Sequence, residues 1–389
     1  MRDLVDIARV VELTSAMVAV DTSNPPGREG PIAEVVRGAL ERWKPEWKQL
    51  EPEPGRVSLV AEIPHPEGNR QRPRLMINGH LDVVPARPDD WSRSPFEPAV
   101  VDGRLYGRGS ADMKGGIAAA ICALEVLERA GRPPGCDVVF HLVADEEVGG
   151  RLGTKALLDA GLIVGDACLI PEPTGMQLCI AERGLYQGHV RVHGVPGHGS
   201  RPREGVSAIE HAARLVLALH GADFGGETHP LLGQPSANVG TIEGGNGLNV
   251  IAESCRFGVD RRVLPGATAE STEAELRSRI EGAGVDGLRY DLDMTIFGEA
   301  SELDRDHDWA GAVADAVLAG AGRKPDVIGM PFTTDARFVR NQRCIPAVVC
   351  GPGEIAQAHV VDEWVSLDAL VDATASYAEL IAAFCTVTA

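Results

Sequence analysis

The segment LMINGHLDVVP (residues 75–85) decides the fold and marks the first candidate site residues. It opens with the short, mostly apolar run 75–78, which is followed by Gly79 and, at the end of the segment, by Pro85. This pattern is typical of a buried parallel strand. His80 and Asp82 follow the run, and side chains of these types bind metals or move protons. Open α/β sheets place their sites just beyond the carboxyl ends of such strands, so we expect a site here.

Four further segments repeat this arrangement, in which carboxylate or imidazole side chains follow a short apolar run. The segments are LYGRGSADMKGG (residues 105–116), VVFHLVADEEVGG (138–150), CLIPEPT (168–174) and VVCGPGEIAQAH (348–359). The side chains in question are Asp112, Glu146, Glu147, Glu172 and His359. Because the carboxyl ends of parallel strands meet at one edge of a sheet, we expect these residues to converge on one crevice.

The donor atoms of this set suit zinc, which takes imidazole nitrogen and carboxylate oxygen and keeps a position for water in catalytic sites. Two zinc ions about 3.5–4 Å apart can share a carboxylate and a water molecule that they activate as a nucleophile. In a consistent assignment Asp112 bridges two metals, His80 and Glu172 bind one, and Glu147 and His359 bind the other. Cobalt and manganese tolerate the same ligands.

Two further roles follow from position along the chain. Glu146 and Glu147 are adjacent at a strand end, so their side chains diverge. One can bind metal while the other stays free as a general base that passes a water proton to the leaving amine. Asp82, two residues after His80, is expected to accept the other imidazole N–H and fix its tautomer. His141 lies inside an apolar strand and is expected to be a core residue.

The expected elements divide the chain into a catalytic domain and an insertion. Over residues 1–183, alternating strands and helices predict a mostly parallel sheet with helices on both faces. Over residues 184–298 the expected order is βαββαβ, that of a small ferredoxin-like α+β domain. Residues 299–389 return to helix and strand and contain His359, so they complete the first domain. Two domains suit a chain of 389 residues.

The composition excludes several classes of function. The formal charge of −19 opposes a nucleic acid or an acidic membrane as partner, while local arginines still permit a small anionic substrate. We expect no signal peptide and no membrane span, and therefore a soluble cytoplasmic protein. The cysteines form no CxxC pair and are interpreted as small buried side chains in a reducing compartment. They are Cys122, Cys136, Cys168, Cys179, Cys255, Cys344, Cys350 and Cys385.

These segments, together with DTSNPPG (residues 21–27) and AHVVDEW (358–364), resemble a known enzyme family over nearly the whole chain. It is the family of acetylornithine deacetylase, succinyl-diaminopimelate desuccinylase, aminoacylase and glutamate carboxypeptidase. The resemblance implies a zinc-exopeptidase-like catalytic domain interrupted by a lid domain, two bound zinc ions and the ligand assignment given above. It also implies that Glu146 is the base and that the Asp112–Met113 peptide bond is cis.

The same resemblance gives a role to His198 in HGVPGHGSRP (residues 193–202). It matches a family histidine that reaches the active site of the partner subunit and polarises the scissile carbonyl. An imidazole donor directed at a developing oxyanion is suited to that role. The resemblance therefore implies a homodimer formed through the lid domain.

Further residues match substrate-binding positions of the family. Asn249 and Arg262 match positions that bind the substrate carboxylate, for which a guanidinium fork is suited. The neighbouring Arg261 points to the opposite face of its strand, and Arg262 is preferred. Thr334 and Arg337 resemble a segment that lines the pocket in the deacetylase branch.

The sequence thus predicts a dinuclear zinc amidohydrolase that removes the acyl group of a small anionic N-acyl amino acid, as a deacetylase or desuccinylase does. A dipeptidase or carboxypeptidase of the same family remains open, because pocket shape separates these activities. A non-catalytic, metal-dependent binding protein is the remote alternative. It is disfavoured because the expected base and all expected ligands are present.

Overall fold

The computed structural model describes residues 1–67, 72–226 and 228–384 of the chain. The described chain forms two compact units. One consists of Met1–Ile180, Leu303–Ile328 and Thr334–Ala389, and the other of Ala181–Glu302 and Gly329–Thr333. The predicted insertion spans residues 184–298, with residues 329–333 in the catalytic domain. In the structure the second unit extends slightly beyond both boundaries and includes that short segment.

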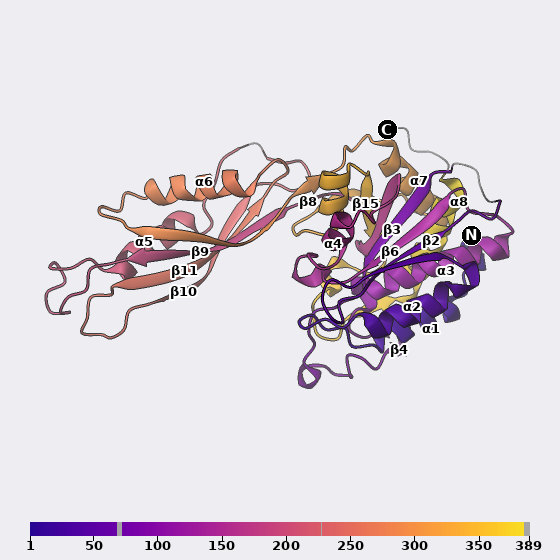
Figure 1. Cartoon of the computed structure of the whole chain (residues 1–389), viewed down its shortest axis with the longest axis horizontal. Helices are drawn as coiled ribbons and strands as arrows, with labels where there is room; N and C mark the ends of the chain where they lie inside the picture. Colours follow the sequence, from indigo (N-terminus) through magenta and orange to yellow (C-terminus); the bar gives the residue numbers. More distant parts are fainter. Residues whose placement is uncertain (68–71, 227, 385–389) are drawn as a thin grey trace. The chain divides into compact units, whose positions relative to one another are not determined.

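The first unit is built on a mixed sheet whose four central strands run parallel (Figure 1). In spatial order they are β6 (Asp137–Val143), β3 (Arg74–His80), β7 (Ala167–Pro173) and β15 (Ala347–Gly351). They confirm the predicted α/β fold. Strands in antiparallel pairing extend this sheet on both sides, with β2 (Ser58–Ile63) and then β1 (Glu46–Leu50) beside β6, and β8 (Leu178–Glu182) beside β15. The short strands β13 (Ser301–Glu302) and β14 (Val327–Met330) pair with β8, and β13 belongs to the second unit.

Helices pack with this sheet and with one another. They are α1 (Ile7–Val18), α2 (Gly30–Leu40), α3 (Gly115–Ala130), α4 (Thr154–Asp159), α7 (Asp308–Ala321) and α8 (Leu367–Ala383). Helix α3 follows directly after Asp112, and its first turn lies close to the backbone of β7. A Cβ atom added at Gly116 would lie 2.1 Å from the carbonyl oxygen of Pro171, so only glycine permits this approach. The approach brings the start of α3 beside the strand that carries Glu172.

A small three-stranded sheet joins two segments that are far apart in the sequence. It consists of β4 (Ala99–Val101), β5 (Arg104–Tyr106) and β16 (Trp364–Ser366). β5 pairs with both other strands in antiparallel register. The sheet thereby holds the chain just before Asp112 beside the chain just after His359. Three-residue strands carry too little periodicity for this sheet to be predicted from the sequence.

The second unit is a four-stranded antiparallel sheet with two helices. Its elements are β9 (Gly184–His193), α5 (Ala208–Leu219), β10 (Ser236–Gly244), β11 (Ser254–Val263), α6 (Ala269–Glu281) and β12 (Tyr290–Gly298). The spatial order β10-β11-β9-β12 is that of the ferredoxin-like fold, which confirms the prediction. Apolar side chains on one face of the sheet, including Val190 and Phe257, pack with Leu215 of α5 and Leu276 of α6.

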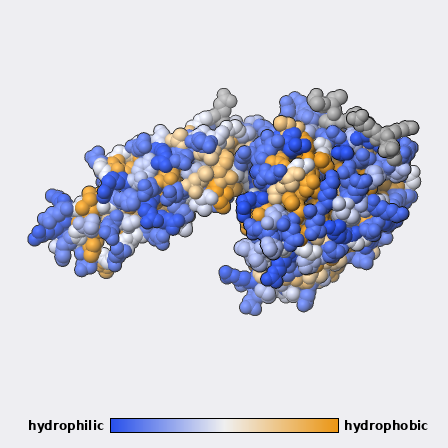
Figure 2. Space-filling view, viewed as in Figure 1, coloured by the Kyte–Doolittle hydropathy of each residue, from blue (hydrophilic) through white to orange (hydrophobic). Residues whose placement is uncertain are grey.

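The edge strands of the second unit expose apolar side chains. Ile242 on β10 and Met294 and Ile296 on β12 are each roughly half exposed. Figure 2 shows hydrophobic residues interrupting the otherwise hydrophilic surface of this unit. Exposed apolar residues on the edge strands of a sheet favour pairing with another chain.

The cysteines mostly occupy the positions expected of small core residues. Cys344 is the exception, because it is exposed in the loop that precedes β15, and Cys385 lies outside the described residues. The buried ones are Cys122, Cys136, Cys168, Cys179, Cys255 and Cys350. Within the described chain, no helix is both long enough and apolar enough to cross a membrane.

His141 is fully buried on the interior strand β6, as expected of a core residue. Its Nε2 lies 3.1 Å from the carbonyl oxygen of Leu162, while its Nδ1 has no hydrogen-bond partner among the described residues. The ring is therefore neutral with its proton on Nε2. Burial lowers the pKa of His141 from 6.5 to about 4.

We predict that His141 makes the protein sensitive to acid. Between the unfolded pKa of 6.5 and the folded pKa of about 4, the unfolded chain binds a proton that the folded protein does not. The free energy of unfolding therefore falls as the pH decreases through this window, by about 3 kcal/mol in total. Urea unfolding across the window should show a clearly smaller fall for His141→Gln, whose neutral amide can still donate to Leu162. Equal falls in the two proteins would contradict the prediction.

Candidate metal centre

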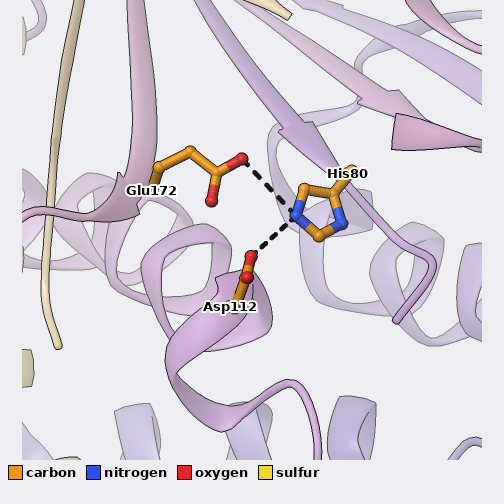
Figure 3. Close-up of side chains that lie close together, drawn as sticks. All are labelled: His80, Asp112 and Glu172. Atoms are coloured by element: carbon orange, nitrogen blue, oxygen red, sulfur yellow. Dashed lines mark hydrogen bonds and ion pairs between the residues drawn. The ribbon is translucent and has the colours of Figure 1, made fainter. Parts of the chain in front are cut away.

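Three buried side chains meet where the parallel strands end (Figure 3). His80 ends β3, Glu172 lies near the end of β7, and Asp112 lies in the segment between β5 and α3. The Nε2 atom of His80 lies 3.0 Å from Oδ1 of Asp112 and 3.5 Å from Oε1 of Glu172. One donor atom from each residue lies within 4.8 Å of the others, so a single cation can contact all three. The Asp112–Met113 peptide bond is cis, which confirms the expectation.

A second group shares Asp112 with the first. The Nε2 atom of His359 lies 2.9 Å from Oε2 of Glu147 and 3.3 Å from Oδ2 of Asp112. Donor atoms of these three residues again lie within 4.8 Å of one another. Asp112 thus faces His80 with one carboxylate oxygen and His359 with the other. The structure brings all five predicted ligands together in the predicted pairing.

The electrostatics of the two groups fit cations. Burial alone would raise the pKa of Asp112, but hydrogen bonds from His359 and His80 hold it far below its usual range. The contacts with Asp112 and Glu147 raise the pKa of His359 to about 10. Burial, together with the nearby Asp112 carboxylate, raises the pKa of Glu172 to about 8. Several carboxylates share a buried space, and imidazole with carboxylate is the donor set that zinc prefers.

Glu146 differs from its neighbour Glu147 in having no partner. Within the described chain its side chain makes no hydrogen bond or ion pair, and it belongs to neither ligand group. Burial raises its pKa well above the usual range, and the carboxylates of Glu172 and Asp335 add to the effect. A partly buried carboxyl that is not engaged by other side chains and lies beside a candidate metal site is suited to exchange protons.

The interaction expected between Asp82 and His80 is made by a different atom. Nδ1 of His80 lies 2.9 Å from the backbone carbonyl oxygen of Asp82 and 3.6 Å from the nearer carboxylate oxygen. The backbone therefore accepts the Nδ1 proton, which leaves Nε2 free to face Asp112. The Asp82 carboxylate accepts instead from the side chain of Asn24 at 2.8 Å and from the backbone N–H groups of Glu146 and Glu147. It thereby supports the turn that carries both glutamates.

A buried ionic network that sequence reasoning missed lies behind this turn. Arg56 donates to Glu29 and lies 3.0 Å from Oδ1 of Asp145, and all three are buried. Asp145 also accepts from the backbone N–H of Leu152 at 2.9 Å. Only Asp145 carried a signal, as the first acidic residue after β6. Glu29 and Arg56 are far from the motifs, and nothing in their local sequence marks them.

The chain is similar over most of its length to a known protein family. Residues 76–383 match the model of Peptidase family M20/M25/M40. The chain belongs to this family. It is 35% identical over 321 residues to a succinyl-diaminopimelate desuccinylase of Methylorubrum populi, covering 79% of this chain and 82% of that protein. These matches confirm the resemblance and the prediction of a metal-dependent amidohydrolase.

Solved structures of other proteins share the fold at low sequence identity. An aminopeptidase from Bacillus cereus has a TM-score of 0.82 at 20% identity, covering 97% of this chain and 99% of that one. A Bacillus subtilis protein described as a dinuclear metal-binding peptidase of the M20 family has a TM-score of 0.69 at 17% identity, covering 97% of both chains. At these identities the likeness establishes the fold.

Two of the remaining predicted site residues lie side by side in the second unit. The backbone N–H of Gly199, next to His198, donates to the carbonyl oxygen of Asn249 at 2.8 Å. The Nδ1 atom of His198 lies 2.7 Å from Oγ of Ser200, and the ring is exposed. Nδ1 therefore has a local partner, while Nε2 makes no hydrogen bond within the described residues.

The two neighbouring arginines of β11 occupy opposite faces of the sheet. Arg261 is buried, pairs with Glu275 at 2.9 Å and stacks on Phe224 with its guanidinium carbon 3.8 Å from the ring centroid. Arg262 lies on the other face, partly exposed, and pairs with Asp260 at 2.8 Å. Arg261 thus stabilises the core of the unit, and Arg262 is the arginine on the more accessible face.

The predicted pocket residues Thr334 and Arg337 are both buried in the first unit. The Nη atoms of Arg337 donate to the carbonyl oxygens of Thr334 at 2.7 Å and of Gly149 at 2.8 Å. Asp335 accepts from the hydroxyl of Thr154 at 2.6 Å. The segment therefore lies against the turn that carries Glu146, with the guanidinium of Arg337 engaged by backbone.

We predict that the protein freed of metal by a chelator binds two equivalents of zinc per chain. His359→Ala and His80→Ala each remove a ligand from one group and should each bind one equivalent tightly, as measured by isothermal titration calorimetry. His198→Ala is the matched control, because this histidine is remote in sequence from both groups, and it should bind two equivalents. Two tight equivalents in His359→Ala would refute the ligand assignment.

Proposed function

We propose that this chain is a zinc-dependent amidohydrolase that removes the acyl group from a small anionic N-acyl amino acid. One observation carries the proposal. The carboxylate of Asp112 is shared by two groups of potential ligands, and beside them lies the partly buried carboxyl of Glu146, which has no partner among the described residues. Ligands alone would equally suit a structural metal site, and it is the unengaged base that favours hydrolysis.

The ligand groups assign the residues that would hold the metal ions. His80 and Glu172 would hold one ion, Glu147 and His359 the other, and Asp112 both. When bound, such a pair supplies an acidified water and polarises the carbonyl of the scissile amide. The hydrogen bond from His80 Nδ1 to the backbone carbonyl of Asp82 orients the imidazole so that Nε2 faces Asp112 and Glu172, the residues that would hold the same ion.

Glu146 would carry the proton between the two halves of the reaction. It takes a proton from the attacking water as the C–O bond forms, and it returns this proton to the amine nitrogen as the C–N bond breaks. Burial favours the protonated state of Glu146, which suits a group that must hold a proton between the two steps. The backbone contacts of Asp82 keep the turn of Glu146 in place.

The substrate-binding residues are proposed from the family resemblance and from their placement. Arg262, near the end of β11, would bind the substrate carboxylate in place of its present partner Asp260. Asn249, in the segment that precedes β11, is proposed as a substrate-binding residue from the resemblance alone. His198 would polarise the scissile carbonyl in the partner subunit of a homodimer. The exposed apolar residues on β10 and β12 support such a dimer. Thr334 and Arg337 would shape the pocket from behind the Glu146 turn.

The acyl group is proposed to be succinyl. This choice rests on the similarity to proteins named succinyl-diaminopimelate desuccinylase, which reaches 35% identity over most of both chains. A second carboxylate on the acyl group would make the substrate more anionic than an N-acetyl amino acid. Arginine is the residue best suited to bind such groups.

Replacing Glu146 tests the proposed base. We predict that Glu146→Gln binds two equivalents of zinc as the unaltered protein does, yet loses about 10²–10⁴-fold in kcat because the proton has no carrier. Glu12→Gln, at an exposed position on α1, controls for the loss of one charge and should keep full activity. A Glu146→Gln variant within a few-fold of the unaltered rate would sink the assignment.

The substrate class is tested by measuring amine release from N-succinyl and N-acetyl amino acids, including N-succinyl-diaminopimelate, and from dipeptides. The expected result is zinc-dependent cleavage, abolished by chelator, with the highest kcat/KM for an N-succinyl compound. Faster cleavage of dipeptides would replace the proposal with a peptidase. No release from any substrate by protein with two bound zinc ions would contradict an amidohydrolase acting on these classes.

A further inference from the structure

Glu363 is a fully buried carboxylate that belongs to neither ligand group. It lies four residues after His359. Its Oε1 atom accepts hydrogen bonds from the backbone N–H of Ala111 at 2.9 Å and from that of Asp112 at 3.1 Å. Its Oε2 atom accepts from the backbone N–H of Gly109 at 3.0 Å. One side chain thus holds three amides of the segment that leads to Asp112.

Two further contacts complete the attachment. The guanidinium of Arg108 donates to Oε2 of Glu363 at 2.6 Å, and the backbone carbonyl of Glu363 accepts from the N–H of Gly107 at 3.0 Å. The next residue, Trp364, begins β16. This strand pairs with β5, which directly precedes the segment that Glu363 holds. Both carboxylate oxygens are occupied by these donors, which leaves Glu363 no role as a ligand.

The His359 loop has few other attachments to the fold. The side chain of His359 is 55% exposed, and its contacts are with Asp112 and Glu147. Between His359 and Glu363, the carboxylate of Asp362 accepts from the backbone N–H of Ser92 at 2.9 Å. Glu363 is therefore the nearest fully buried anchor of this loop. Its partners are the residues that precede Asp112.

We propose that Glu363 is a positioning residue that keeps the Asp112 segment and the His359 loop in the arrangement that binds the second metal ion. The inference rests on the proposed function, because it presupposes that both ligand groups bind metal. The group of Asp112, Glu147 and His359 takes two of its three ligands from the segments that Glu363 joins. The group of His80, Asp112 and Glu172 takes only one. Loss of Glu363 should therefore weaken the second group more than the first.

Calorimetric titration of the chelator-stripped protein with zinc tests this inference. Glu363→Gln keeps the size of the side chain but turns an NH2 group toward N–H donors. The tighter of the two equivalents should stay within a few-fold of the unaltered affinity. The other should weaken about 10–100-fold, the range typical for residues that orient metal ligands. Adding His359→Ala to Glu363→Gln identifies the weakened group, because the double variant should lose only that equivalent.

Two control variants separate positioning from general destabilisation. Glu125→Gln removes another buried carboxylate, on α3. It pairs with the partly exposed side chains of Arg9 and Arg129. Arg108→Gln removes the charged partner of Glu363 and leaves its three backbone hydrogen bonds in place, so it should weaken the second equivalent less than Glu363→Gln does. Glu125→Gln should have a lower melting temperature and unchanged zinc affinities. A Glu363→Gln protein that behaves as Glu125→Gln does would overturn the proposal.

The remaining outcomes also decide the question. Equal weakening of both equivalents in Glu363→Gln would overturn the selective role of this residue. Fewer than two equivalents in the unaltered protein would instead contradict the proposed function. If Glu363→Gln does not fold, Glu363→Asp is titrated in its place, because its carboxylate is one methylene too short to reach all three amides. The same selective loss is expected of it, and unchanged binding would refute the inference.

Discussion

The shared carboxylate of Asp112 is the constraint on which the rest of the site depends. Its two oxygens face two imidazoles that come from opposite ends of the sequence, His80 at the end of β3 and His359 in the loop after β15. Buried carboxylates repel one another in a medium of low polarity, and this repulsion must be offset by cations or by hydrogen bonds. The imidazoles offset it in the present structure, and a pair of metal ions would offset it further.

The fold solves two different positioning problems. His80 and Glu172 belong to parallel strands, so the ladder of β3 and β7 fixes their spacing. Asp112 and His359 lie in irregular segments, which have no ladder of their own. The small sheet of β5 and β16 and the carboxylate of Glu363 fulfil that role for both segments. A metal site with ligands of both kinds needs both devices.

The candidate ligands could be recognised in the sequence because each follows a motif at the end of an apolar run. The ferredoxin-like order could be predicted because its strands alternate clearly. The hydrogen-bond partners of the site residues were harder to predict from the sequence. The carboxylate of Asp82 was assigned to His80, whereas the backbone carbonyl takes that place, since the choice between two acceptors in one residue depends on side-chain rotation. Arg56 and Glu29 were missed because a buried ion pair leaves no periodic trace in sequence.

The contacts also suit two adjacent glutamates to the different roles proposed for them. Both backbone N–H groups donate to Asp82, so the turn is held in one conformation. Glu147 is then fixed at both carboxylate oxygens, because Oε1 accepts from the backbone N–H of Val84 at 3.2 Å and Oε2 lies 2.9 Å from His359. Glu146 has no such partner in the part of the chain that the structure describes. A ligand must be held in place before the metal arrives, while a base must be able to move between water and amine, and the hydrogen bonds around this turn separate the two requirements.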